Sequence, residues 1–194
     1  SAIDGAKNKG EGPEHYKPHD YFSDLVAKVY PLYQQRLLQS GAVDFGDLLL
    51  NLQKLLRRED DAGIRLRKRY EHVLVDEFQD TNRVQYNLVK LLSSTSRNLV
   101  VVGDDDQAIY GWRGADVRNI LDFERYHPDA RVVKLEQNYR STQVILDAAN
   151  SIIAKNPERR PKRLFTEQGA GEPILCVAHE DERREADFVV RTLR

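Results

Sequence analysis

From residue 73 onward, short apolar runs alternate with segments whose apolar residues recur at helical spacing. This pattern predicts strands that are apolar on both faces, which is typical of a parallel α/β sheet. The apolar runs lie at residues 73–75, 99–102, 132–135 and 174–177. The helical patterns run through residues 84–92, 117–121, 144–152 and 186–193. Ligands of such sheets bind at the carboxyl ends of the strands, so we expect the chemistry in the residues that follow each run.

The part before residue 73 has a purely helical pattern. Asp20 is expected to cap a helix in which Pro31 causes a kink or restart and which Gly41 ends. A second helix is expected to open at Asp44, because Asp47 three residues later resembles a capping box. The expected apolar faces are Phe22, Leu25, Val26, Val29 and Tyr33 in the first helix, and Phe45, Leu48, Leu49, Leu52 and Leu55 or Leu56 in the second.

The composition is that of a soluble globular protein. The chain has 194 residues, enough for one large domain or two small ones, and 40% of them are hydrophobic and 31% charged. No apolar run approaches the roughly 20 residues of a membrane helix, and the start does not resemble a secretory signal. Cys176 is the only cysteine. It excludes an intramolecular disulfide and a cysteine-based zinc site, and it fits a reducing, cytoplasmic location.

Three stretches carry local compositional signals. Residues 1–19 are rich in Gly, Lys, Glu and Pro without apolar periodicity, so we expect a mobile loop or frayed end. The net charge of −1 does not indicate a nucleic-acid binder. Residues 155–163 are basic, which favours a solvated linker over a phosphate-contacting patch. Residues 184–194 have the pattern of a helix interior, so we expect the chain to be a piece cut from a longer one.

Asp76 and Glu77 follow the first apolar run. A carboxylate at this place can hold magnesium, which prefers oxygen ligands. Its neighbour can orient and deprotonate an attacking water. On these residues alone, a polar cap on a turn is the more common explanation.

A glycine-flanked loop, residues 103–115, follows the second run. It opens with three adjacent carboxylates, Asp104 to Asp106, and later offers Tyr110, Trp112 and Arg113. Aromatic rings interleaved with arginine suit single-stranded bases, because every base has a face that can stack. The alternative is that Trp112 anchors the core, and the spacing favours neither.

Arg140 follows the third run, next to Ser141, which is a good helix cap. An arginine at such a strand-to-helix turn can stabilise a transferring phosphoryl group. A lone arginine there is more often a structural ion-pair partner.

Together these segments resemble, in order and spacing, the motifs of the UvrD, Rep and PcrA family of superfamily-one DNA helicases. The matching segments are residues 43–49, 75–82, 103–115, 135–142 and 161–167. The resemblance implies part of a RecA-like, P-loop NTPase core with a helical N-terminal part. It also implies an enzyme that uses ATP and Mg²⁺ to move 3′ to 5′ along single-stranded DNA and to unwind duplexes in repair or replication.

The resemblance assigns roles to individual residues. The implied catalytic and nucleotide-binding residues are Asp76 and Glu77 at magnesium, Glu77 as general base, Gln107 as γ-phosphate sensor, Tyr139 against the adenine and Arg140 as arginine finger. The implied contacts to single-stranded DNA are Tyr110, Trp112 and Arg113, with Phe45 a weaker candidate. Two residues depart from the family: Ala108 replaces a common serine, and Gly46 replaces a common aspartate and is expected to loosen its helix start.

The phosphate-binding loop of this family, G-x-x-x-x-G-K-[ST], has no match in the sequence. Gly5 with Gly10, and Gly41 with Gly46, have the glycine spacing but are followed by Glu11 and Asp47 in place of lysine. We therefore expect an internal piece that does not hydrolyse ATP by itself. Its expected parts are the end of a helical insertion (1–42), the later half of a first RecA-like domain (43–135) and the start of a second (136–194).

Three other interpretations remain at this stage. The chain can be the helicase region of a RecB- or AddA-like helicase–nuclease, which shares these motifs. It can be a truncated nucleic-acid-binding module without ATPase activity. It can also be a metal-dependent nuclease built on Asp76, Glu77 and Asp104 to Asp106, although the resemblance explains those residues better. The expected partners are single-stranded and partly duplex DNA, without a membrane.

Overall fold

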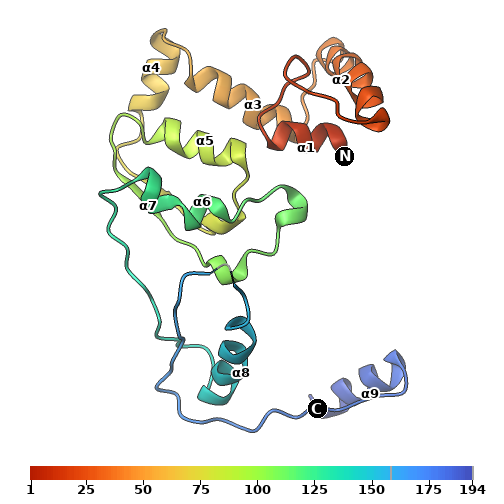
Figure 1. Ribbon diagram of the computed structural model, residues 1–194, viewed down its shortest axis with the longest axis vertical. Coiled ribbons are helices and arrows are strands. Elements are labelled where there is room, and N and C mark those ends of the chain that lie inside the picture. The colour runs from red at the N-terminus through yellow and green to blue at the C-terminus, as the bar shows by residue number, and fades with distance from the viewer. Residues whose placement is uncertain (158, 194) are drawn as a thin grey trace. The chain divides into compact units, whose positions relative to one another are not determined.

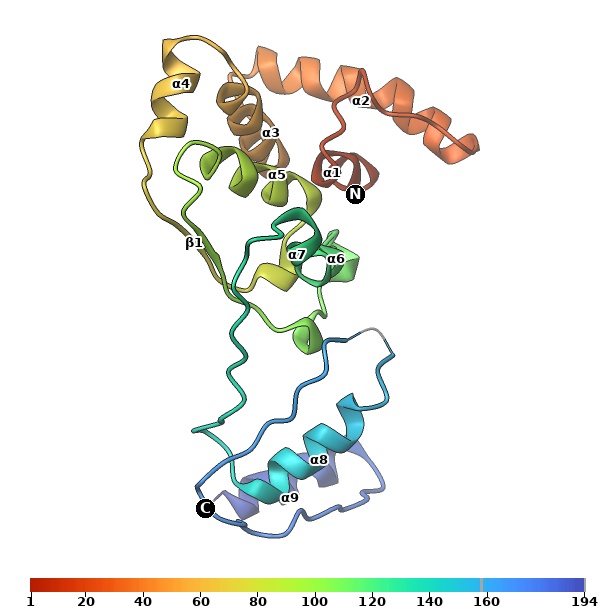
Figure 2. The same cartoon turned by 60° about the vertical axis from the view of Figure 1, so that its left-hand side comes forward.

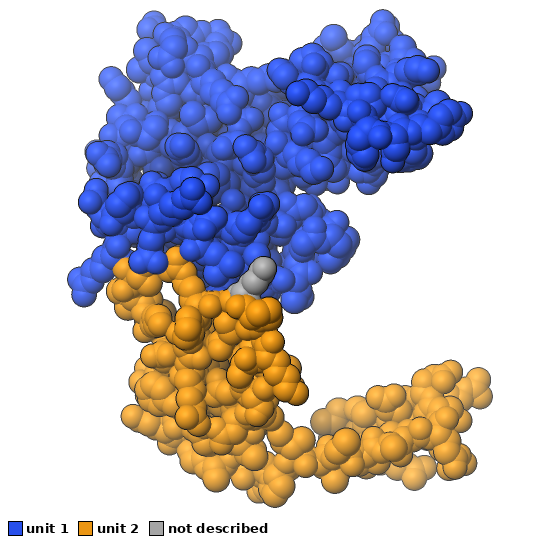
Figure 3. Space-filling model, viewed as in Figure 1, with its two compact units in different colours: residues 1–131 blue, residues 132–194 orange. Residues whose placement is uncertain are grey.

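The computed structural model describes residues 1–157 and 159–193 and divides into two compact units, Ser1–Arg131 and Val132–Arg194 (Figure 3). Two residues named in the sequence predictions lie outside the described residues. They are Glu158, the acidic residue of the basic stretch, and Arg194, at the end of the last predicted helix. No helix in the described ranges has the length and apolar character needed to cross a membrane.

Unit 1 combines a helical N-terminal part with a small sheet (Figure 1). Its α-helices are α1 (Ala2–Asn8), α2 (Tyr21–Gln39), α3 (Phe45–Leu56), α4 (Asp61–Lys68), α5 (Arg83–Leu92), α6 (Arg118–Leu121) and α7 (Phe123–Tyr126). Its strands are β1 (Val73–Val75) and β2 (Leu99–Val101), and its short 3₁₀ helices are η1 (Phe78–Asp80), η2 (Asp105–Gln107) and η3 (Gly111–Arg113).

The two strands of unit 1 pair in parallel, with Val73 opposite Leu99, Leu74 opposite Val100 and Val75 opposite Val101. The first two predicted strands and their parallel pairing are thus confirmed. Parallel strands need a crossover between them, and α5 supplies it. The family expectation of a RecA-like α/β core is met only in part, because the described sheet has two strands.

A small apolar core lies between α3 and α5 (Figure 2). Its buried members are Leu50, Leu56, Val84 and Leu88, with Leu49, Leu52, Leu66, Leu91 and Leu92 packed around them. The predicted face of α3 is correct at Leu49, Leu52 and Leu56. It is wrong at Phe45 and Leu48, which are exposed, and it missed Leu50. The predicted face was therefore rotated around the helix relative to the buried one, which runs through Gly46, Asp47, Leu50, Gln53 and Leu56.

The start of the chain is a helix, so the expectation of a mobile loop over residues 1–19 is wrong for Ala2–Asn8. Ser1 caps α1 by accepting the N–H of Asp4 at 3.1 Å. Ala6 and Lys7 are buried on α1. A buried face made of alanine and lysine has no apolar periodicity, and this explains why the sequence pattern gave no helix signal.

Helix α2 begins at its predicted cap. Asp20 accepts the N–H of Ser23 at 2.7 Å, and Ser23 accepts the N–H of Asp20 at 2.8 Å, forming a capping box. Of the two outcomes expected at Pro31, a kink or a restart, the restart is wrong, because one helix continues through the proline; it removes a single N–H donor and the flanking turns hold. Gly41, in the left-handed region at φ 61°, follows the helix end as expected.

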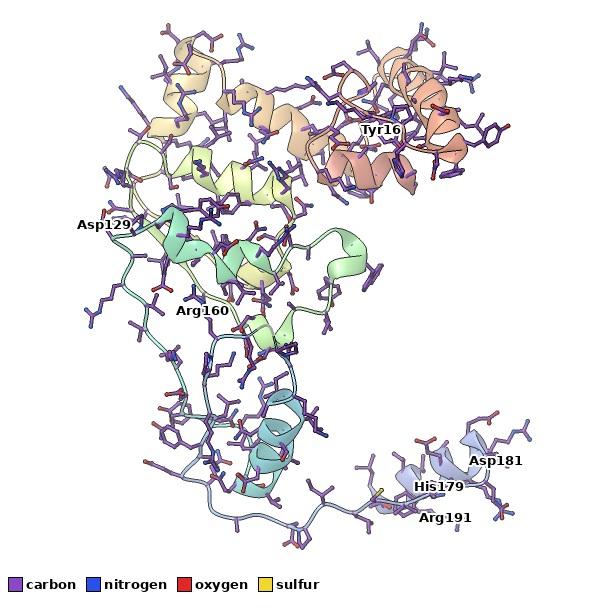
Figure 4. All side chains as sticks on the ribbon, viewed as in Figure 1. Tyr16, Asp129, Arg160, His179, Asp181 and Arg191 are labelled. Carbon is purple, nitrogen blue, oxygen red and sulfur yellow. The ribbon has the colours of Figure 1, made fainter. Side chains whose placement is uncertain are left out.

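The buried face of α2 is Ser23, Val26 and Tyr30, with Tyr16 packed edge-on against Tyr30 at 6.2 Å between ring centres (Figure 4). Of the predicted apolar positions only Val26 is buried, whereas Phe22, Leu25 and Val29 are exposed.

Unit 2 contains α8 (Gln143–Ile153) and α9 (Glu182–Thr192), which match two predicted helices. Asp181 caps α9 by accepting the N–H of Arg184 at 2.8 Å (Figure 4). The predicted strands at residues 132–135 and 174–177 are wrong, since neither run is a strand. Within the described part of unit 2, strand-like pairing is limited to a bridge between Gln137 and Phe165. A strand exists only when a neighbour completes its hydrogen bonds, and these runs have none.

Candidate functional site

The end of β1 places two carboxylates side by side. Asp76 and Glu77 are both exposed, and an oxygen of Asp76 accepts the N–H of Glu77 at 2.9 Å. Glu77 adopts the left-handed conformation, φ 49° and ψ 43°, which costs energy for a residue other than glycine. The turn is held on its far side, where the N–H of Phe78 donates to the carbonyl of Val102 at 2.9 Å. Strain at this position marks it as a functional candidate.

Gln79 links the two strand ends. Its side chain is buried, its Nε2 donates to Glu77 Oε2 at 2.8 Å, and its Oε1 accepts the N–H of Asp104 at 3.0 Å. A Cβ on Gly103 would lie 2.6 Å from that same Oε1 atom. Glycine is therefore required at position 103 for the loop after β2 to reach Gln79.

Gln107 continues this path of hydrogen bonds. Its Nε2 donates to Asp104 Oδ2 at 2.8 Å, while Asp104 Oδ1 accepts the N–H of Asp106 at 3.0 Å. The path thus runs from Glu77 through Gln79 and Asp104 to Gln107. The sequence motifs indicate the two ends of this path, Glu77 and Gln107, but not Gln79. Its signal was its place two residues after Glu77, in a turn that must pack on the neighbouring strand end.

Three residues beyond Gln107, the loop around η3 presents the predicted aromatic cluster. The Arg113 guanidinium carbon lies 5.1 Å from the centre of the Tyr110 ring and 4.7 Å from that of Trp112. Trp112 is 77% exposed, so the interpretation of Trp112 as a core anchor is wrong. Gly114, at φ 89°, turns the chain back, and Ala115 bridges to Asn82. Exposed rings with a guanidinium between them form a surface that can stack on bases.

Phe45 is the first residue of α3 and is 88% exposed. The helix start beside it is capped on both sides: Asp44 accepts the N–H of Asp47 at 2.8 Å, and Asp47 accepts that of Asp44 at 3.3 Å. The predicted capping box is confirmed. Burial by itself would raise the pKa of Asp44, but hydrogen bonds from Lys7, the Asp47 N–H and Tyr33 outweigh burial and hold the pKa below its usual value.

The predicted nucleotide-binding residues of unit 2 lie in a turn before α8. Asn138 Oδ1 accepts the N–H of Arg140 at 2.9 Å and that of Ser141 at 2.7 Å. The cap position of α8 is Thr142, so the prediction of Ser141 as cap is wrong by one residue: Ser141 still belongs to the turn held by Asn138, and the helix begins after it. The Tyr139 hydroxyl donates to Gln137 Oε1 at 3.0 Å, and its ring is exposed.

Arg140 is exposed and, among residues 1–157 and 159–193, has no ion-pair partner. This does not favour the interpretation of Arg140 as a structural ion-pair residue. In the same ranges, no three His, Cys, Asp or Glu side chains gather in a group that could hold a metal ion.

Comparison with protein families decides the family. The family of the UvrD/REP helicase N-terminal domain matches residues 1–128, and that of the UvrD-like helicase C-terminal domain matches residues 133–194. The chain belongs to the UvrD-like helicase family. The resemblance inferred from the motifs is thereby confirmed, and with it the family origin of the segments that carry Asp76, Gln107 and Arg140.

Curated members of the UvrD-like helicase family align along almost all of the chain. The ATP-dependent DNA helicases PcrA of Staphylococcus aureus (strain Mu50) and of Leuconostoc citreum are 47% identical over 194 residues, and that of Staphylococcus epidermidis is 45% identical. In each case 99% of this chain is covered, but only 26–27% of the relative. The chain thus spans about a quarter of the length of these helicases.

Proposed function

We propose that this chain is part of an ATP-dependent DNA helicase that couples ATP hydrolysis to 3′-to-5′ movement on single-stranded DNA and to duplex unwinding. The observation that carries the proposal is the hydrogen-bond path from Glu77 through Gln79 and Asp104 to Gln107. It ends three residues before Tyr110, the start of the aromatic loop. A change at the nucleotide can therefore reach the DNA surface through one short stretch of chain. The names of the curated relatives support the same activity.

The carboxylates at the end of β1 fit a magnesium-bound nucleotide. Magnesium keeps several waters and takes one or two carboxylates together with phosphate oxygens, so the pair Asp76 and Glu77 suffices without a third protein ligand. Both side chains are exposed at the strand end and thus accessible to a ligand. When bound, the ion neutralises charge that develops on the phosphates.

Glu77 acts as the general base in this proposal. Its Oε2 atom is held by Gln79, which leaves the other carboxylate oxygen to take a proton from the attacking water. Gln107 senses the γ-phosphate through an amide that Asp104 already orients. The replacement of a common serine by Ala108 removes one hydroxyl beside this sensor and leaves the path itself intact.

Unit 2 contributes Tyr139 and Arg140. The exposed Tyr139 ring is offered to the adenine, and Arg140 stabilises the transferring phosphoryl group as an arginine finger. The Asn138 turn fixes the backbone of Arg140 while leaving its side chain accessible. Tyr110, Trp112 and Arg113, with Phe45, bind single-stranded DNA next to a partly duplex region. A cytoplasmic location fits an enzyme acting on DNA.

A helicase region within a RecB- or AddA-like helicase–nuclease is the closest alternative, because the same residues serve there. A nucleic-acid-binding module without ATPase activity is the alternative from another class. It would keep the aromatic loop, but it gives no reason for the strained Glu77 or for the buried Gln79 that orients it.

The test is Glu77→Gln in a full-length protein that carries this segment. Hydrolysis stimulated by DNA should fall by roughly 10²-fold, while nucleotide binding is retained, because the amide cannot accept the proton. Glu71→Gln is the matched control, since Glu71 is an exposed carboxylate just before β1. Unchanged turnover in Glu77→Gln at saturating DNA would overturn the assignment of the base.

A further inference from the structure

Lys7 is a buried cation outside the proposed catalytic residues. Its side chain is 0% exposed, and its Nζ lies 2.6 Å from Asp44 Oδ2 and 2.7 Å from Asp47 Oδ1. Gln34 Oε1 accepts a hydrogen bond from the same Nζ at 2.7 Å. A buried ammonium is tolerated only when it is paired in this way, and removing one partner from such a pair is strongly destabilising. Lys7 thus fastens α1 to the first turn of α3, the turn that carries Phe45.

Gly46 makes this close contact possible. A Cβ at position 46 would lie 2.6 Å from Lys7 Cδ and 2.9 Å from Lys7 Cβ. In this chain the stem of Lys7 therefore occupies the space that a side chain at position 46 would fill.

Asn8, the next residue, fastens the aromatic loop. Its Nδ2 donates to the carbonyl of Arg113 at 3.3 Å, and its Oδ1 accepts from Asn82 Nδ2 at 3.1 Å. Gly114 lies so near that its Cβ would sit 3.3 Å from Asn8 Cβ.

The orientation of the Asn8 amide follows from its neighbours. Asn82 caps α5 with its Oδ1, which accepts the N–H of Gln85 at 2.9 Å, so its Nδ2 must face Asn8. The oxygen of Asn8 therefore points to Asn82 and its nitrogen to Arg113. One amide is held at both ends.

We propose that Lys7 and Asn8 are positioning residues that set the separation between Phe45 and the loop of Tyr110, Trp112 and Arg113, as two parts of one surface for single-stranded DNA. Figure 1 shows the start of α3 and the loop between β2 and α6 close to α1. Two consecutive residues of α1 hold these two segments, which are far apart in sequence. The inference rests on the proposed function in one respect, namely that the exposed rings bind DNA.

The first experiment measures binding of a labelled oligothymidine of about sixteen nucleotides to the 194-residue chain by fluorescence anisotropy. Asn8→Ala should weaken binding by roughly three- to tenfold, the loss expected for one hydrogen bond. The same substitution in a Trp112→Ala background should have no further effect, because the ring that Asn8 positions is gone. Equal losses in both backgrounds would reduce Asn8 to a general stabilising residue and overturn the proposal.

Gly46→Ala tests the Lys7 half without removing Lys7 or either of the carboxylates that pair with it. The new Cβ must displace Lys7, so DNA binding should weaken, and the effect should vanish in a Phe45→Ala background.

Asn119→Ala is the matched control for Asn8, because Asn119 also donates a side-chain hydrogen bond to a backbone carbonyl, that of Thr81 at 2.9 Å, but does not touch the loop. It should leave DNA binding unchanged.

Amide hydrogen exchange without DNA separates the two proposals. Asn8→Ala should speed exchange at Arg113, Gly114 and Ala115, whose N–H groups donate within the loop, and leave α5 protected. If the unmodified chain fails to bind oligothymidine, the proposed DNA contact is wrong. Faster exchange in this loop in Asn8→Ala would still show that Asn8 positions the loop. Unchanged exchange at these three amides would overturn the inference, whatever the DNA measurement gives.

Discussion

Short apolar runs form paired strands in unit 1 but not in unit 2. In unit 1, the apolar runs at residues 73–75 and 99–102 contain paired strands β1 and β2. In unit 2, the runs at residues 132–135 and 174–177 are unpaired, and Leu135 and Leu175 are largely exposed. Among the described residues, all buried apolar side chains except Leu146 lie in unit 1. An apolar run therefore predicts a strand only on the condition that a neighbouring strand completes it.

The candidate site residues of the two units also differ in how they are held and in how exposed they are. In unit 1, Glu77 and Gln107 are joined by hydrogen bonds between segments far apart in sequence, through Gln79. In unit 2, the backbone of Arg140 is held by Asn138, two residues away. Unit 1 thus fixes its part of the site through the buried side chain of Gln79. In unit 2 the N–H of Asn138 also donates to the carbonyl of Phe165 at 2.7 Å, but Tyr139 and Arg140 stay exposed.

The largest expected effect tests whether this exposed turn of unit 2 matters as much as the hydrogen-bonded site of unit 1. In the full-length protein, Arg140→Ala should lower DNA-stimulated ATP hydrolysis by roughly 10³–10⁵-fold, because an arginine finger acts on the transferring phosphoryl group. Arg183→Ala, on the exposed face of α9, is the matched control and should keep full turnover. Steady-state phosphate release measures both variants. Full activity of Arg140→Ala would leave the catalytic residues in unit 1 alone.

The second prediction compares the two cores. Leu56→Ala should lower the free energy of unfolding of unit 1 by about 2–5 kcal/mol, because it opens a cavity among Leu50, Val84 and Leu88. Leu146→Ala in α8 should cost less, since Leu146 is the only buried apolar side chain among the described residues of unit 2. Urea unfolding, followed by hydrogen exchange in each unit, measures both losses. Equal losses would show that unit 2 has a core of comparable strength.

Local chemistry was predictable from the sequence, and tertiary context was not. The caps at Asp20 and Asp44 were predicted correctly because a cap depends on residues within one helical turn. Helix α1 was missed because its buried face depends on Lys7 meeting carboxylates 37 and 40 positions later in the chain. Gln79 was missed for the same reason, as its partner Asp104 belongs to the loop after the next strand. The roles at the site came from the family motifs.

The third prediction concerns an exception within unit 1, the exposed ring of Trp112. Trp112→Ala should weaken single-strand binding by about 1–3 kcal/mol with little sequence preference, and Trp112→Phe should retain most of it, because a smaller ring still stacks. The melting temperature should stay close to the original, since the ring contributes little to the core. As Trp112 is the only tryptophan, its fluorescence quenching by oligothymidine gives a direct titration of the unmodified chain.

Phe78→Ala is the matched aromatic control for Trp112. Phe78 is fully buried and packs edge-on against Phe123 at 5.7 Å between ring centres, so its loss should cost about 3–5 kcal/mol of folding stability. If Trp112→Ala melts as early as Phe78→Ala and still binds DNA, the assignment of Trp112 to the DNA surface is wrong.

The smallest expected effect is on the pH dependence of folding stability, and it should come from His127, which follows α7 in unit 1. Its ring stacks on Phe123 at 4.4 Å between ring centres, and burial, together with the nearby charges of Lys90 and Arg97, holds the pKa of His127 below its ordinary value of 6.5. In the unfolded chain the ring takes up a proton at higher pH than in the folded chain. The contribution of His127 to stability is therefore fully present above pH 6.5 and is lost as the pH falls from 6.5 through the lower folded-state pKa.

The urea midpoint should be lower at about pH 5.5 than at about pH 7.5, and His127→Gln should reduce this difference. His72→Gln, on an exposed ring before β1, should leave the difference in place. A difference that persists in His127→Gln would place the pH-sensitive group elsewhere in the chain.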